Sequence, residues 1–168
     1  MARAPGAPLV VDANVLIDYL AADANVLGLV SHQVGPVHIP RQILREVPRL
    51  GVEDCERLGL RIVDESVEQL LEAGRQHGRL SFYDHLCLIL ARENGWTCVT
   101  NDRALRRACA EHSVPVLWGL ELMIQLVAGR QMTAEMAVKV ASAIRESNPH
   151  HVTEDILVRF ENRLKEVG

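Results

Sequence analysis

The stretch Leu9-Val10-Val11-Asp12 places a carboxylate directly after a short apolar run. Three further acids stand beside apolar segments in the same way, namely Glu46, Asp84 and Asp102. A carboxylate beside a buried segment is costly unless a partner compensates its charge. Four such acids in one small domain predict a shared partner, and the simplest is a hard divalent cation bound through oxygen, Mg²⁺ or Mn²⁺.

Short β-branched runs alternate with longer helical patterns, which predicts a three-layer α/β/α fold with a central parallel sheet of about five strands. The expected strands are 9–12, 37–39, 61–63, 97–100 and 114–117. The expected helices lie near 14–21, 24–33, 41–48, 67–77, 82–94, 103–112, 119–129, 134–147 and 154–166. Ser66 and Ser81 are expected helix N-caps, because Gln69 and Asp84 follow at the capping-box spacing, and Gly95 is expected to end a helix.

Length and hydropathy predict one main domain. A chain of 168 residues can bury roughly two-thirds of its unfolded surface. We expect the domain over 1–148 and a C-terminal helical extension over 149–168, whose last helix has an apolar stripe that packs on the domain or forms an interface. The stripe consists of Ile156, Leu157, Phe160 and Leu164. The apolar runs are far shorter than the roughly 20 residues needed to cross a bilayer, and the sequence shows no hydrophobic signal core. We therefore expect a cytoplasmic protein without a membrane partner.

The charge balance is ambiguous about nucleic acids. A net charge of −4 argues weakly against a nucleic-acid binder. However, clustered acids that hold a metal contribute to this charge, and only Lys139 and Lys165 among the 18 basic residues are not arginine, the side chain best suited to phosphate. Genomic base composition explains the arginine content equally well. The four cysteines lack metal-site spacing and are expected to be structural thiols.

The four acids are expected to converge, because ligands of open parallel sheets collect at the carboxyl ends of the strands. Asp12 ends the first strand, Asp102 follows the fourth, Asp84 lies in a first helical turn, and Glu46 lies on the helix after the second strand. Each acid also has a structural alternative. Asp84 and Asp102 could be helix caps, and Asp12 could bond to backbone in a turn with Asn14. Glu46 could pair with Arg45, Arg49 or a more distant arginine.

In order and spacing, these segments resemble the PIN-domain family of metal-dependent ribonucleases, in particular its toxin-like members. The resemblance covers about residues 8–130. The segments that carry it are Val10-Val11-Asp12-Ala13-Asn14-Val15-Leu16-Ile17-Asp18, Ile39-Pro40 leading to Glu46-Val47, Leu80-Ser81-Phe82-Tyr83-Asp84, and Val99-Thr100-Asn101-Asp102-Arg103-Ala104-Leu105. The resemblance implies an endoribonuclease with one or two Mg²⁺ or Mn²⁺ ions per site.

By this resemblance, the four acids are both the metal ligands and the catalytic residues. It also implies that Asn14, Thr100 and, more weakly, Asn101 are polar groups around the metal or the substrate. Arg41, Arg45 and Arg103 lie on helices that carry or follow an expected ligand, so they could position RNA phosphates, or could form a solvated face paired to local acids. Tyr83 and Trp118 are the only plausible aromatic side chains for base stacking, so we expect RNA to be recognised by shape and backbone.

The resemblance further implies the toxin of a toxin–antitoxin pair, with a small antitoxin protein as partner and a homodimer as the assembly. The helices near 134–147 and 154–166 lie beyond the resemblance and could cover the site, build the dimer or lengthen the core. Two other functions stay open. A metal-dependent phosphatase would need an acid where Asn14 stands and a lysine near the site, and a non-catalytic module would bind metal or RNA without cleavage.

Overall fold

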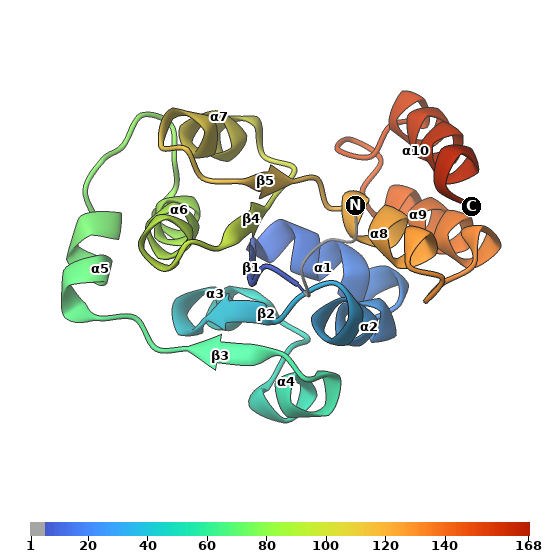
Figure 1. Ribbon diagram of the computed structural model, residues 1–168. Helices are drawn as coiled ribbons and strands as arrows, with labels where there is room; N and C mark the ends of the chain where they lie inside the picture. The colour runs from blue at the N-terminus through green and yellow to red at the C-terminus, as the bar shows by residue number, and fades with distance from the viewer. Residues whose placement is uncertain (1–5) are drawn as a thin grey trace.

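A single five-stranded sheet forms the centre of the protein, as Figure 1 shows for the computed structural model, which describes residues 6–168. The strand order is β3-β2-β1-β4-β5, and every neighbouring pair is parallel. The strands are β1 (Leu9–Val11), β2 (Val37–Pro40), β3 (Arg61–Val63), β4 (Thr97–Val99) and β5 (Val116–Leu117). The predicted parallel α/β sheet is confirmed.

Helices cover both faces of this sheet, which makes the three layers of the predicted fold (Figure 1). One face carries α5 (Val67–Ala73), α6 (Phe82–Asn94) and α7 (Arg103–Glu111). The other carries α1 (Ala13–Ala22), α2 (Asn25–Gln33), α8 (Glu121–Ala128), α9 (Ala134–Ser147) and α10 (Glu154–Val167). Two short helices, α3 (Arg41–Glu46) and α4 (Val52–Leu58), lie between β2 and β3.

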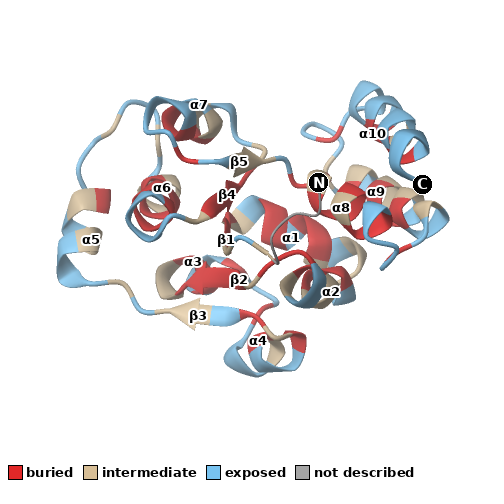
Figure 2. Cartoon of the chain, viewed as in Figure 1, coloured by how far each residue is buried: buried red, intermediate tan, exposed pale blue. Residues whose placement is uncertain are grey.

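Helix α6 is the most deeply buried helix beside the sheet, and Figure 2 shows its buried residues. Residues 86–91 are at most 1% exposed, as their uninterrupted apolar character predicts. The helix begins where the Ser81 hydroxyl accepts the backbone N–H of Asp84 at 3.1 Å. It ends at Gly95, whose φ of +68° suits a residue without a side chain. Both expected boundaries are therefore confirmed, and α6 is fixed rigidly at the end that carries Asp84.

Most expected elements differ from the observed ones by one or two residues at an end, and four differences have a clear cause or consequence. Helix α4 was not predicted, because it is only seven residues long and mostly charged, although Gly51 and the left-handed Gly59 bracket it. Helix α3 ends at Glu46 instead of residue 48, since Pro48 disfavours helical geometry at the residue before it. Helix α5 ends at Ala73 instead of residue 77, where Gly74 lowers helix propensity. Strand β5 spans only two of the four expected residues.

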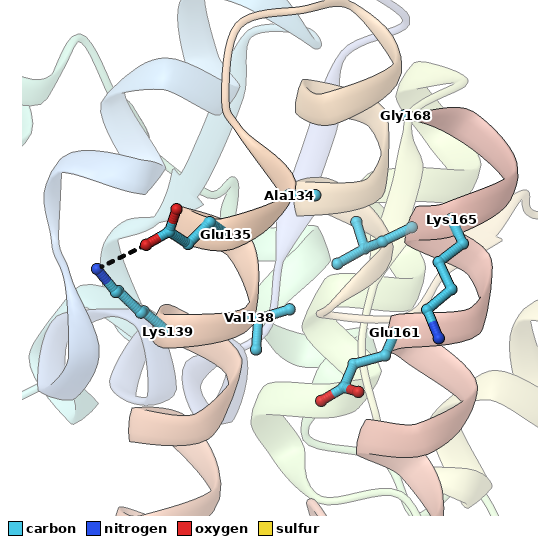
Figure 3. Close-up of a pocket in the computed structure, with 8 residues that line it drawn as sticks. Ala134, Glu135, Val138, Lys139, Glu161, Lys165 and Gly168 are labelled. Atoms are coloured by element: carbon cyan, nitrogen blue, oxygen red, sulfur yellow. Dashed lines mark ion pairs between the residues drawn. The ribbon is translucent and has the colours of Figure 1, made fainter.

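The C-terminal helices extend the layer formed by α1, α2 and α8. Helix α10 packs on α8 and α9 through Leu157, Phe160 and Leu164, which are buried as the apolar stripe predicts. Figure 3 shows the pocket that α9 and α10 line next to this contact. Ile156 was also expected in this stripe but is 36% exposed, because it lies in the first turn on the flank of the packed face. No helix within residues 6–168 is long and apolar enough to cross a membrane.

Candidate active site

Asp12 is held by two hydrogen bonds at the carboxyl end of β1. It caps α1, since one carboxylate oxygen accepts the backbone N–H of Val15 at 2.8 Å. The other oxygen accepts the hydroxyl of Thr100, which follows the neighbouring strand β4. The side chain is only 2% exposed, so this carboxylate is both buried and fixed in direction.

Asp102 is joined to Asp12 through Thr100. The fully buried Thr100 hydroxyl donates to Asp12 and accepts the backbone N–H of Asp102 at 3.0 Å. Asp102 caps α7, because its Oδ1 accepts the backbone N–H of Leu105 at 2.8 Å. Capping therefore accounts for one oxygen of Asp102, and Thr100 connects the ends of two adjacent strands.

Asp84 approaches the same place from the first turn of α6. Its Oδ2 accepts the Ser81 hydroxyl at 2.9 Å, while Ser81 accepts its backbone N–H, so the expected capping interaction is present. The carboxylate nevertheless interacts electrostatically with both Asp12 and Asp102. Three acids far apart in the sequence are thus brought together at one edge of the sheet.

The pKa values reflect this crowding. Burial, and secondarily the negative charges of Asp84 and Asp102, raise the pKa of Asp12 to about 6. Burial, followed by the charge of Asp102, also raises the pKa of Asp84 above its usual range. Within residues 6–168, none of the three carboxylates forms an ion pair with lysine or arginine. The negative charge at this edge is therefore uncompensated by basic side chains.

Glu46 is exposed at the last residue of α3, and its connection to this group runs through Tyr83. Its Oε1 accepts the hydroxyl of Tyr83 at 2.8 Å, which raises the pKa of that tyrosine. Because Tyr83 directly precedes Asp84, this bond links Glu46 to the helix that carries the third acid. The alternative expectation of an ion pair with Arg45 or Arg49 is not met among the described residues.

The other three expected polar residues, Asn14, Thr100 and Asn101, lie in different surroundings. Asn101 accepts the backbone N–H of Gly119 at 2.8 Å, so its side chain fixes the turn after β5. Asn14 is exposed in the first turn of α1, two residues after Asp12. Thr100 alone of the three contacts two of the acids.

The expected phosphate-binding arginines also differ from one another. Arg41 forms an ion pair with Asp64, which follows β3, as the alternative of a face paired to local acids predicts. Arg45 reaches only the side chain of Gln42, at 3.5 Å. Arg103 lies directly after Asp102 and remains exposed. Of the three, Arg103 is therefore best placed beside the acids.

A groove of about 900 Å³ extends from Asp102 along α7. Its walls are the segment before α6 and one flank of α7, and its basic side chains are His77, Arg79, Arg103 and Arg107. Sequence reasoning missed His77 and Arg79 because they lie between α5 and α6 with no pattern around them. Glu111 also lines the groove and pairs with Arg107 at 3.1 Å, so the positive charge beside the acids comes chiefly from Arg79 and Arg103.

The donor set fits a hard cation in its chemistry. All the converging groups are carboxylate or hydroxyl oxygens, which Mg²⁺ and Mn²⁺ prefer. Each Asp12 oxygen accepts one hydrogen bond, and a carboxylate has about four acceptor positions in all, so capacity remains for a ligand bond. Within residues 6–168, no three His, Cys, Asp or Glu side chains are arranged closely enough to hold a metal ion. The four cysteines are free and buried.

Comparison with protein-family models, with curated proteins and with solved structures finds no match for this chain. Function is therefore inferred from the chemistry of the site itself.

Proposed function

We propose that this chain is a Mg²⁺- or Mn²⁺-dependent endoribonuclease of the PIN-domain kind. One observation supports this above all. Three carboxylates converge at the carboxyl edge of a parallel sheet, those of the buried Asp12, the half-buried Asp84 and the exposed Asp102, and no basic side chain of the described chain forms an ion pair with them. Like charges around a buried carboxylate are unfavourable for the fold alone, whereas a bound cation would make them favourable.

Each residue would have a role in metal binding or catalysis that follows from its position. Asp12, the most buried acid, would anchor the cation, and Asp84 and Asp102 would complete the set of ligands. A bound metal supplies charge stabilisation at the phosphoryl oxygens and a lowered water pKa. Thr100 would keep Asp12 and Asp102 in register through its two hydrogen bonds. The exposed carboxylate of Glu46, oriented by Tyr83, would accept the proton of the attacking water or help to hold the metal.

The substrate would be positioned by the basic groove. Arg103 and Arg107 lie on one face of α7, and Arg79 faces them from the segment before α6. Guanidinium groups bind phosphate oxygens in a bidentate manner, so this groove suits a polynucleotide backbone that leads to Asp102. The groove favours RNA over the small phosphate esters of a phosphatase, since a small ester would contact only the acids.

Cleavage of a mixed RNA pool tests the proposal. Wild type, Asp12→Asn and Asp18→Asn are compared in Mn²⁺, in Mg²⁺ and in EDTA. Asp18 is a matched control, because it is a buried acid of the same helix that hydrogen-bonds to Asn148 instead of the cluster. We expect metal-dependent cutting by wild type and Asp18→Asn, and its loss in Asp12→Asn. Normal cutting by Asp12→Asn would contradict the assigned site.

The remaining outcomes separate the alternatives. Turnover of p-nitrophenyl phosphate without RNA cleavage would favour a phosphatase. Metal binding by the folded wild type without turnover of either substrate would favour a non-catalytic module.

The resemblance extends the proposal to a toxin that acts as a homodimer and is inhibited by a small antitoxin protein. Induced expression in a bacterial host provides the test. We expect growth arrest with wild type and normal growth with Asp12→Asn at equal protein levels. Growth arrest by both proteins would separate toxicity from the acid cluster.

A further inference from the structure

Trp118 lies at the same edge of the sheet as the acids. Leu117 of β5 pairs with Val99 of β4, which in turn pairs with Val11 of β1. The residues that follow these three in the chain are Trp118, Thr100 and Asp12. Adjacent strands are about 4.8 Å apart, so the Trp118 backbone is roughly 10 Å from that of Asp12.

The turn that carries Trp118 is fixed on its far side. The next residue, Gly119, donates its N–H to Asn101 Oδ1 at 2.8 Å and accepts the Tyr19 hydroxyl at 2.6 Å. A Cβ at Gly119 would approach the Asn101 amide to 3.0 Å, so only glycine fits this contact without a shift. The aromatic ring is therefore mounted on a rigid support instead of a loose loop.

One face of the Trp118 ring is covered by arginine. The guanidinium carbon of Arg106 lies 3.5 Å from the ring centroid, and the same guanidinium donates to the carbonyl of Thr100 at 3.3 Å. Trp118 is nevertheless 50% exposed. Because Arg106 covers one face of the ring, the exposed surface of the Trp118 ring must lie on the opposite face and the ring edge. The ring is thus held in one orientation with a free face.

This exposure contrasts with the other tryptophan. The chain has two tryptophans, and Trp96 is partly buried against the core, with its ring stacked on His38 at a centroid distance of 4.1 Å. A large aromatic side chain usually contributes to stability by burial. Trp118 keeps half of its surface in water at the same sheet edge as the acids, with Arg106 of α7 on its ring. Exposed aromatic rings next to arginine are what single-stranded nucleic-acid sites use to stack bases.

We propose that Trp118 stacks an unpaired base of the substrate beside the acid cluster. The inference rests on the proposed ribonuclease function and adds a base-contacting residue to it. In a duplex, both faces of each base are already stacked, so the free face of Trp118 has nothing to accept. At a rise of about 3.4 Å per nucleotide, 10 Å corresponds to a stacked base within a few nucleotides of the cleaved bond.

Tryptophan fluorescence reports the stacking without any cleavage. Trp96→Phe leaves Trp118 as the only tryptophan, and Trp118→Phe leaves only Trp96. Each protein is titrated in EDTA with a single-stranded mixed-sequence RNA and with the same RNA annealed to its complement. We expect quenching only for Trp96→Phe with the single strand. Equal quenching by the duplex, or none by the single strand at saturating RNA, would overturn the proposal.

Affinity measured in the same buffer distinguishes stacking from a structural role. Trp118→Ala should bind the single strand roughly 5- to 150-fold more weakly than wild type, the range typical of one lost stacked base. Trp118→Phe should recover most of this affinity, whereas Trp118→Leu should not, because leucine fills space without a flat face. Binding to the duplex should be unchanged in all three variants. An equal loss for single strand and duplex would assign Trp118 to folding or phosphate contact.

The two proposals fail separately. Metal-dependent RNA cleavage with no effect of Trp118→Ala on affinity or fluorescence would refute stacking and leave the ribonuclease intact. Quenching and selective loss of affinity without cleavage by wild type would refute the ribonuclease and leave a single-strand-binding site.

Discussion

Charged side chains are paired in the C-terminal helices and unpaired at the acid edge, the group formed by Asp12, Asp84 and Asp102. At the interface of α8 and α10, Glu121 accepts two hydrogen bonds from Arg163, at 2.5 and 2.8 Å, and Arg145 pairs with Glu154 at 2.6 Å. At the acid edge, no basic side chain of the described chain pairs with the three acids. The charges of the C-terminal region are paired, whereas the like charges of the acid edge repel one another, and the proposed cation would offset this repulsion.

The buried apolar side chains of α10 are expected to contribute more to the stability of the C-terminal region than its ion pairs do. Phe160 is 4% exposed between α10 and its neighbours, so Phe160→Ala should lower the free energy of unfolding by about 3–5 kcal/mol. Urea denaturation measures this loss. Val158→Ala is the matched control on the same helix, since Val158 is 48% exposed and its loss should change stability little. Metal-dependent cleavage per folded molecule should stay at the wild-type level in Phe160→Ala, and its loss would link α10 to the site.

Removing a charge from the acid edge should have the opposite effect on stability. The folded protein holds the Asp12 proton up to about pH 6, whereas the ordinary value is 3.8. Wild-type stability therefore falls as pH rises from about 4 to 6 and remains lower above it, by about 3 kcal/mol in total. Asn does not titrate and caps helices as well as Asp does.

In EDTA, Asp12→Asn should thus be more stable than wild type by about this amount at pH 8, and the gap should close near pH 4. Urea denaturation at both pH values measures the gap. A constant difference across this pH range would mean that burial of the charge is not its cause.

A bound metal should offset the loss of folding stability that the acid edge causes. Mg²⁺ or Mn²⁺ at 100 times its dissociation constant should stabilise wild type by about 2.7 kcal/mol through mass action. Phe160→Ala should gain the same increment, because its cavity is far from the acids and independent effects add. Asp12→Asn should gain much less. Thermal unfolding with and without metal measures all three, and an equal gain in Asp12→Asn would place the metal elsewhere.

The exposed ion pair of the C-terminal region should give the smallest effect. Arg163 is 48% exposed, so Glu121→Gln is expected to lower the free energy of unfolding by only about 0.2–1 kcal/mol, and less at high salt. A double-mutant cycle with Arg163→Met isolates the pair. A coupling well above 1 kcal/mol would show that this bidentate contact behaves as a buried pair.

Most of the fold could be predicted from local patterns, and the failures have local causes. The strand expected over 61–63 and the helices expected over 82–94 and 134–147 are found with the same bounds. Their apolar runs, caps and terminal residues all indicate the same boundaries. Helix α4 escaped prediction because its few apolar residues, Val52, Cys55 and Leu58, are too short a pattern to distinguish it from a charged loop.

The site was only partly accessible to the same reasoning. Asp12, Asp84 and Asp102 could be singled out because each is an acid beside a buried element, a signal that a single segment carries. The hydrogen bond between Tyr83 and Glu46 joins residues 37 apart in the chain, so no local pattern contains it. The same holds for Arg79 in the groove and for the contact between Arg106 and Trp118.

By itself, the sequence determined the elements and the acids, because hydrophobic periodicity and capping chemistry act within a few residues. It also determined which side chains could bind a hard cation. Only the tertiary structure decided which other residues lie next to these side chains. Parallel pairing in the order β3-β2-β1-β4-β5 places β1 between β2 and β4, and thereby sets Asp12 beside Thr100 and two strands from Trp118. Strand order depends on packing across the whole domain, and packing alone brings distant residues into one site.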